Sequence, residues 1–216
     1  MTRHIAFIIF TLLANASTAG ARDVKIDSTT INLTVPQGFC ELDENSDRVN
    51  GLRELLGERN QLLAAYADCR SNLSLPLDNF AHYIMPAVAR NVILPADGIT
   101  KICAGMRKNG EEKLAVILRD RATDIAKVFA GLKINESRFI GVVAESPAVC
   151  YTAVVQKLVM GAGKENLLLD ISAAMNIKGK FVVYHLYSPY ISADTVATML
   201  DRQKSNVSAF FAANPK

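Results

Sequence analysis

The amino-acid sequence predicts an α+β fold, in which helices pack against a mostly antiparallel sheet that ends in a C-terminal meander. Three observations support this fold class. Polar and apolar residues alternate near the start, the apolar residues follow a helical period in the middle, and the last third holds four strand-like segments separated by tight turns. Consecutive strands that are joined by tight turns pair antiparallel.

Residues 1–21 have the three parts of a secretory signal peptide, which is removed on export. Arg3 gives a basic start, Ile5 to Leu13 is apolar except for Thr11, and small residues follow. The apolar run is too short for a membrane-spanning helix, which needs about 20 residues. We therefore expect a mature chain that begins near Arg22, has no integral membrane segment, and is periplasmic or secreted.

The expected organisation is a flexible lead-in over residues 22–30 and a single α+β domain over residues 31–216, because a chain of this length suits one domain. The chain has a formal net charge of +3, and 50% of its residues are hydrophobic. This hydrophobic content excludes a largely disordered chain. The near balance of charge argues against a nucleic-acid partner.

Four cysteines fall in the expected mature chain, namely Cys40, Cys69, Cys103 and Cys150. An even number of cysteines in an oxidising compartment predicts up to two disulfides. Three pairings are possible, and we favour Cys40–Cys69 with Cys103–Cys150, which joins neighbours along the chain; spacing alone leaves the pairing open. The first bond would close a loop of about 30 residues and contribute about 3 kcal/mol in the chain-entropy model.

The first third of the mature chain predicts two short strands and a helix. Residues 30–35 alternate between polar and apolar, as a half-buried strand does, and residues 39–42 continue the strand after a bend. Ser46 or Asp47 can cap a helix that runs to about Arg59, because its apolar residues recur at intervals of three and four.

The middle of the chain is ambiguous at first and then becomes clearly helical. Residues 61–70 fit either a helix or a strand, and residues 79–88 fit a strand or irregular structure. From residue 97 to 132 the apolar residues follow a helical period, which Asn109-Gly110 interrupts. This pattern predicts two helices or one bent helix that ends near Gly131.

The last third predicts the meander and a final helix. The four expected strands cover residues 138–145, 148–160, 166–177 and 181–188. Both faces of the fourth strand are mainly apolar, so we expect a covered or central strand. Ser192 can cap a helix over residues 192–213, with Asp194 in its first turn. The apolar stripe of this helix should lie on the sheet.

The densest aromatic group comprises Tyr184, His185, Tyr187 and Tyr190. Tyrosines suit binding surfaces because they are rigid and amphipathic, but they also favour strands on their own account. We note these four residues as a possible binding surface.

The sequence contains no motif for catalysis, metal binding or cofactor binding. The mature chain has only two histidines, His82 and His185, and no metal-ligand spacing. We therefore expect no catalytic residue, no metal and no cofactor. The alternative is a thiol-dependent enzyme in which a pair such as Cys150 and His185 carries the chemistry. The expected oxidising compartment argues against this enzyme, because it favours disulfides over free thiols.

Two segments carry a resemblance to known proteins. They are Val35 to Asp43 together with Tyr66-Ala67-Asp68-Cys69, and Phe181 to Pro189 with Tyr190 and the helix that follows. These segments resemble a group of uncharacterised exported proteins of alphaproteobacteria, and the order of elements is similar to the Mog1/PsbP-like α/β sandwich. The resemblance implies small adaptor and assembly roles, and it carries over no functional residues.

The sequence thus leads us to expect an exported, non-catalytic binding or assembly module of the bacterial cell envelope, with a protein as its partner. Two alternatives stay open at this point. One is a secreted, host-directed factor of the virulence type, and the other is the thiol-dependent enzyme.

Overall fold

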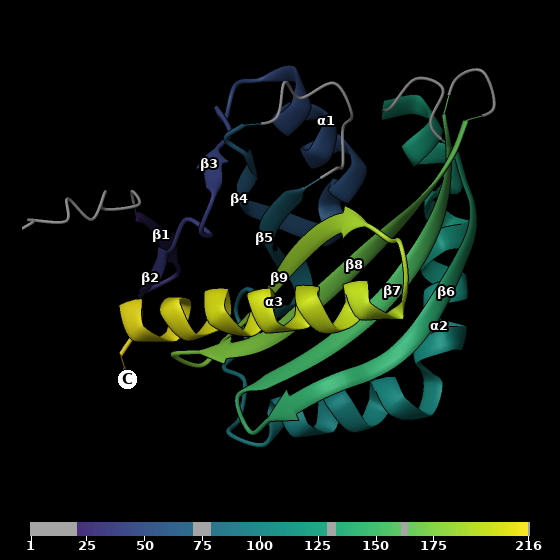
Figure 1. Ribbon diagram of the computed structural model, residues 1–216. Helices are drawn as coiled ribbons and strands as arrows, with labels where there is room; N and C mark the ends of the chain where they lie inside the picture. Colours follow the sequence, from purple (N-terminus) through teal and green to yellow (C-terminus); the bar gives the residue numbers. More distant parts are fainter. Residues whose placement is uncertain (1–20, 71–78, 129–132, 161–163, 216) are drawn as a thin grey trace, which may run out of the picture.

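The computed structural model in Figure 1 describes residues 21–70, 79–128, 133–160 and 164–215, without the side chains of residues 117–133, 160 and 164. The expected signal peptide lies outside the described residues apart from Ala21. Gly131, the expected end of the middle helix, lies outside them as well.

The described residues confirm the α+β fold. A seven-stranded sheet has the order β3-β4-β5-β9-β8-β7-β6, and a separate sheet pairs β1 with β2; all neighbouring strands are antiparallel. The strands are β1 (Arg22–Ile26), β2 (Thr29–Leu33), β3 (Phe39–Glu41), β4 (Asn60–Asp68), β5 (Phe80–Pro86), β6 (Lys133–Ser146), β7 (Val149–Met160), β8 (Lys164–Ile177) and β9 (Lys180–Pro189). The helices are α1 (Asp47–Leu56), α2 (Gly98–Val128) and α3 (Ala193–Ala213), with short 3₁₀ turns η1 (Gly57–Arg59) and η2 (Ala87–Ala89).

Three layers are visible in Figure 1. Helix α3 lies across one face of the large sheet, and α1 and α2 lie against the other face. The strands β6 to β9 form the expected meander. Within the described residues, the pairing of β5 with β9 is the one strand contact that joins this meander to β3, β4 and β5.

Residues 22–30 were expected to be a flexible lead-in, but they start the fold. They form β1 and the beginning of β2, and Ile26 and Ile31 are buried in the main core. The alternation of Val24 with Ile26 is too short a signal to predict a strand from sequence alone. The end of α3 secures this hairpin, because the Asn214 side chain exchanges hydrogen bonds of 2.8 and 2.7 Å with the backbone N–H and C=O of Asn32.

The turn of the same hairpin is tied to the large sheet by a buried lysine. Lys180 is only 6% exposed, and its Nζ lies 2.7 Å from Asp27 Oδ2 and 3.0 Å from the carbonyl oxygen of Arg90. A buried ammonium group needs such partners because its desolvation is costly. One side chain therefore connects β9, the hairpin turn and the segment after η2.

The helices begin close to their expected positions. The N–H of Val49 donates to Ser46 Oγ at 3.4 Å, which makes Ser46 the cap of α1. Helix α3 starts with a capping box in which Ser192 and Thr195 satisfy each other's backbone N–H groups. Helix α2 is continuous except at Asn109, whose φ of −135° and ψ of 18° bend it at the expected break.

The two ambiguous segments of the middle both form strands. β4 and β5 lie inside the sheet with both faces covered, by α3 on one side and α1 on the other. Residues 63–67 are consequently all buried, as are residues 80–85. A strand that is buried on both faces loses the period of two, which explains why its sequence also fits a helix.

Candidate functional site

The structure does not bring the four residues of the expected binding surface together. β9 lies near the centre of the sheet, so its side chains alternate between two covered faces. Tyr184 is fully buried beneath α3, where its hydroxyl accepts a hydrogen bond of 3.2 Å from Asn206 Nδ2. Burial raises the pKa of the Tyr184 hydroxyl well above its ordinary value. Tyr190 is half-buried against the same core, whereas His185 and Tyr187 point to the opposite face.

On that opposite face, His185 belongs to a row of polar residues that crosses the centre of the sheet. The strand register places His82 of β5 beside His185, and His185 beside Ser172 of β8. Asp170 lies two positions before Ser172 and so shares its face. We call His82, His185, Ser172 and Asp170 the polar row. It lies between an apolar cluster under α1 and another around α2.

The geometry of Asp170, His185 and Ser172 differs from that of a hydrolase triad. His185 Nδ1 lies 3.0 Å from Asp170 Oδ2 and 3.2 Å from Ser172 Oγ. A triad needs the carboxylate and the hydroxyl on different ring nitrogens, because the imidazole accepts a proton at one while the carboxylate orients the other. Here both oxygens contact the same nitrogen, so Asp170 orients the imidazole but Ser172 is not placed as a nucleophile.

His82 is the most constrained member of the polar row. It is 3% exposed, and its Nδ1 has no hydrogen-bond partner among the described residues. Its ring stacks on that of His185 with the ring centroids 4.8 Å apart, and also on Tyr187 at 5.5 Å. Burial, and to a smaller extent the charge that His185 can carry, lower the pKa of His82 well below its ordinary value. His82 is therefore a neutral, packed ring at neutral pH.

The polar row is not arranged as a metal centre. In the part of the chain that the structure describes, no three His, Cys, Asp or Glu side chains gather in a way that could hold a metal ion. The two imidazoles stack face to face, whereas shared metal ligands have to converge on one point. The sequence singled out His185 but missed its partners, because their contact depends on the register of strands that are distant in the chain.

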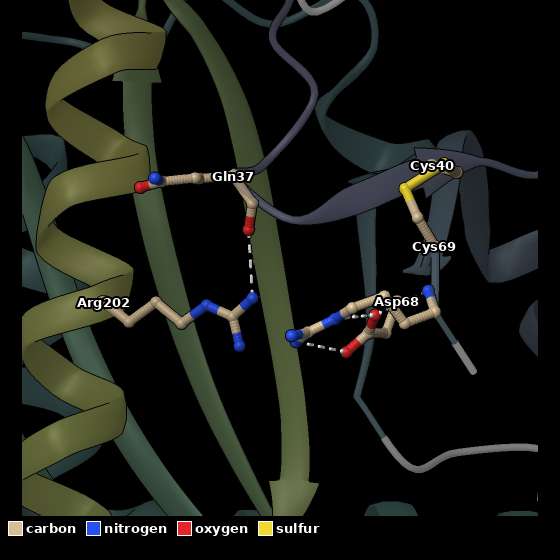
Figure 2. The surroundings of a disulfide bond; sticks show 6 residues. Gln37, Cys40, Asp68, Cys69 and Arg202 are labelled. Atoms are coloured by element: carbon tan, nitrogen blue, oxygen red, sulfur yellow. Dashed lines mark hydrogen bonds and ion pairs between the residues drawn. A yellow bond between two sulfur atoms is a disulfide. The ribbon is translucent and has the colours of Figure 1, made fainter.

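The four cysteines form the two disulfides that the sequence favoured. Cys40 is bonded to Cys69 at the end of β4, and Cys103 of α2 is bonded to Cys150 of β7. No cysteine remains free. Figure 2 shows the first bond at the edge of the sheet, beside the segment that the Arg202 side chain of α3 reaches.

The thiol pair considered from the sequence is not assembled. Cys150 Sγ is already bonded to Cys103, and β8 separates the strand of Cys150 from that of His185. Since the nucleophile of a thiol enzyme is a thiolate, Cys150 cannot attack a substrate in this form of the protein.

A cavity of about 700 Å³ lies where the bend of α2 faces a bulge in β6. Gly110 follows the bend, and a Cβ atom there would lie 2.3 Å from a ring carbon of Phe139. A larger residue at this position would therefore have to displace the Phe139 ring. The β6–β7 register shifts between Phe139 and Gly141, and Gly141 has a φ of +135°, which favours glycine. The bulge leaves Ile140 41% exposed.

The cavity combines charged and apolar walls. Helix α2 contributes four charged side chains, and β6 contributes mainly apolar ones. The lining residues are Arg107, Lys108, Asn109, Gly110, Glu111, Glu112, Ala115, Phe139, Ile140, Gly141 and Val142. Arg107 also forms an ion pair of 2.8 Å with Glu145. The volume of the cavity falls in the range of ligand sites, roughly 300–1,000 Å³. The sequence predicted the break at Asn109-Gly110 but not the bulge opposite it.

Comparisons with known proteins show a distant likeness in fold. No protein-family model matches the chain, and no curated protein does. Among solved structures, the chain is similar to cyanobacterial PsbP from Synechocystis sp. PCC 6803, with a TM-score of 0.38 and 12% identity over 89% of this chain and 94% of that one. It is also similar to the Ran-binding protein Mog1p of Saccharomyces cerevisiae, with a TM-score of 0.31 and 11% identity over 91% and 93% of the two chains. Both likenesses are distant, and no role of this chain follows from them. No helix among the described residues is long and apolar enough to cross a membrane.

Proposed function

We propose that this protein is an exported, non-catalytic binding or assembly module of the bacterial cell envelope, and that its protein partner contacts the cavity between α2 and β6. The cavity is the observation that carries the proposal. It is formed by two irregularities, the bend at Asn109 and the bulge at Gly141, that meet on the surface.

The wall chemistry supports a protein partner. Protein interfaces combine an apolar centre with a polar rim, and here the exposed Ile140 lies among charged side chains of α2. β6 is an edge strand, but its register with β7 shifts at three places. Such bulges hinder the addition of another strand. The partner is therefore expected to insert a side chain into the cavity and not to extend the sheet.

The two disulfides support an exported protein, because such bonds persist in oxidising compartments. Fractionation of a tagged copy tests this part of the proposal. Recovery from the periplasm, with residues 1–21 removed, is the expected result. Recovery in the medium or a host cell would favour the host-directed alternative, and a cytoplasmic protein with reduced cysteines would contradict export.

A pull-down from periplasmic extract tests the binding site. Ile140→Arg places a charge in the cavity mouth and is expected to reduce the captured partner at least about tenfold, which corresponds to about 1.4 kcal/mol. Ile191→Arg is the matched control, because Ile191 is 86% exposed and does not line the cavity. Equal capture by both variants and the parent protein would contradict the assigned site. Absence of any partner, together with turnover of a defined substrate, would overturn the function.

A further inference from the structure

The disulfide between Cys40 and Cys69 lies in unusually accessible surroundings. Both of its residues are exposed, whereas Cys103 is 0% and Cys150 1% exposed. The bond links Cys40, in the outermost strand β3, to Cys69, which follows β4. Strand β3 has three residues and pairs only with β4 among the described residues. A thiol in solution can therefore approach one disulfide and not the other.

The other attachments of the segment that this bond holds are noncovalent. Phe39 is buried on the face opposite Cys40, and the Arg202 guanidinium carbon lies 4.6 Å from the centroid of its ring. Arg202 Nη2 also donates a hydrogen bond of 3.0 Å to the carbonyl oxygen of Gln37, which Figure 2 shows. Three residue pairs with β4 add to these contacts, together with backbone hydrogen bonds on either side of β3 and an ion pair of 3.2 Å between Arg22 and Glu41. The Cys40–Cys69 bond is thus the covalent link that adds to these contacts in keeping β3 in place.

Exchange between a thiol and a disulfide depends on access to a sulfur atom, because the attacking thiolate must reach it directly. We propose that Cys40–Cys69 is a site of thiol–disulfide exchange with a dithiol protein of the Cys-x-x-Cys class, and that the exchange controls the attachment of β3. This inference is independent of the binding cavity and goes beyond the proposed function.

The reaction proceeds in two balanced steps. A thiolate of the dithiol attacks one sulfur of the Cys40–Cys69 pair, a mixed disulfide forms, and the other cysteine leaves as a thiolate that takes a proton from water. The second thiol of the dithiol loses its proton and attacks the mixed disulfide, which releases the second cysteine. Two electrons pass to the protein, which ends with two thiols, and the dithiol becomes a disulfide.

Reduction would remove the covalent link without removing Phe39 from the core directly. β3 would then be held only by noncovalent contacts, namely the buried Phe39, the pairs with β4, and the side chains of Arg202 and Arg22. We expect more frequent local opening of β3, which uncovers the backbone of β4 at Tyr66 and Ala67. Strand β4 then becomes an accessible sheet edge.

The chemical test is a time course of reduction of the folded protein. The full mature chain is treated with dithiothreitol or with a Cys-x-x-Cys oxidoreductase, free thiols are alkylated, and peptides are identified by mass spectrometry. Cys40 and Cys69 are expected to become labelled at least about tenfold faster than Cys103 and Cys150, because access limits exchange. Equal rates for the two pairs, or faster labelling of Cys103 and Cys150, would overturn the proposal.

A trapping experiment asks whether a dithiol protein can use the site. An oxidoreductase whose second cysteine is replaced by serine cannot complete the second step, so it stays attached to the cysteine it attacked. We expect a mixed disulfide at Cys40 or Cys69. Reduction by dithiothreitol without any trapped adduct would show an exposed bond that excludes protein thiols, and it would contradict the proposed site.

Hydrogen exchange tests the structural consequence. Backbone amides of β3 and of residues 66–68 are expected to exchange at least about tenfold faster after selective reduction, while those of β7 and β8 stay protected. The variant Cys40→Ser/Cys69→Ser should reproduce this change without reductant. Unchanged exchange in both preparations would show that the bond does not control β3.

Discussion

Each of the two disulfides of this protein holds a different strand of the large sheet, and one bond is buried whereas the other is exposed. Cys103–Cys150 lies in an apolar cluster with Ile99, between α2 and β7, where packing already holds both partners. Cys40–Cys69 lies at the exposed edge, where β3 pairs with β4 alone among the described strands. In the interior the sulfur atoms are themselves part of a packed cluster, whereas at the edge Phe39 is buried but both cysteines are exposed.

A disulfide can stabilise a protein through the unfolded chain and through its surroundings in the folded state, and the sequence does not distinguish the two bonds in either respect. A crosslink stabilises mainly by restricting the unfolded chain, and the restriction grows slowly with loop length. The two loops span 29 and 47 residues, so this contribution is similar for both bonds. Any larger difference in stability must therefore come from the folded state, where one pair of sulfurs is packed and the other is exposed.

The largest expected effect comes from deleting each disulfide in turn. Cys103→Ala/Cys150→Ala should lower the free energy of unfolding by about 5 kcal/mol, because the loss of two packed sulfur atoms adds to the loss of the crosslink. Cys40→Ala/Cys69→Ala should lower it by about 3 kcal/mol, because only the crosslink is lost. Urea unfolding monitored by circular dichroism measures both values.

The comparison holds only if the two variants differ in this order. A larger loss for the edge pair would mean that Cys40–Cys69 supports more of the fold than its exposure indicates. The slope of the unfolding transition serves as a control, because an unchanged slope shows that both variants still unfold in one cooperative step.

The sequence predicted the regions whose pattern is set locally. The caps at Ser46 and Ser192, the break at Asn109-Gly110 and the C-terminal meander all depend on residues close together in the chain, and the structure confirms them. The favoured disulfide pairing is also confirmed. The exposure of each bond was not predictable, because it depends on which elements cover the sheet.

The features that sequence missed depend on contacts between distant segments. His82 and His185 meet because β5 pairs with β9 out of chain order, and no periodicity reveals that pairing. The cavity needs the bend of α2 to face the bulge of β6, but the sequence reveals only the bend. The strand character of β4 was hidden because burial of both faces removed its alternation.

A change of pH is expected to have an effect of intermediate size on stability, through the buried side chain of His82. His82 has a pKa well below 6.5 in the folded protein because of burial and His185. The unfolded chain, with a pKa near 6.5 at this residue, therefore binds a proton first as the pH falls. The contribution of the neutral His82 ring to the free energy of unfolding is complete above pH 6.5. As the pH falls from 6.5 to the pKa of the folded protein, this contribution decreases by about 1.4 kcal/mol for each pH unit.

The variant His82→Leu isolates this contribution. Between pH 7.5 and pH 5 the parent protein should lose more stability than the variant, by up to about 2 kcal/mol, because leucine does not titrate. At pH 7.5 the variant loses no hydrogen bond at Nδ1, which has no partner in the described structure. Parallel loss of stability in both proteins would show that His82 does not control the acid response.

The smallest expected effect concerns the noncovalent hold on the edge. Arg202→Gln removes the contact with the Phe39 ring and the hydrogen bond to Gln37, and it should cost about 1 kcal/mol in the oxidised protein. Lys204→Gln is the control, because Lys204 is exposed on the same helix and should change stability by less than about 0.5 kcal/mol. After selective reduction of Cys40–Cys69, Arg202→Gln should also increase hydrogen exchange in β3 well beyond that of the reduced parent protein, because no crosslink then retains the strand. If reduction and Arg202→Gln together open β3 no more than reduction alone, α3 does not help to hold this edge.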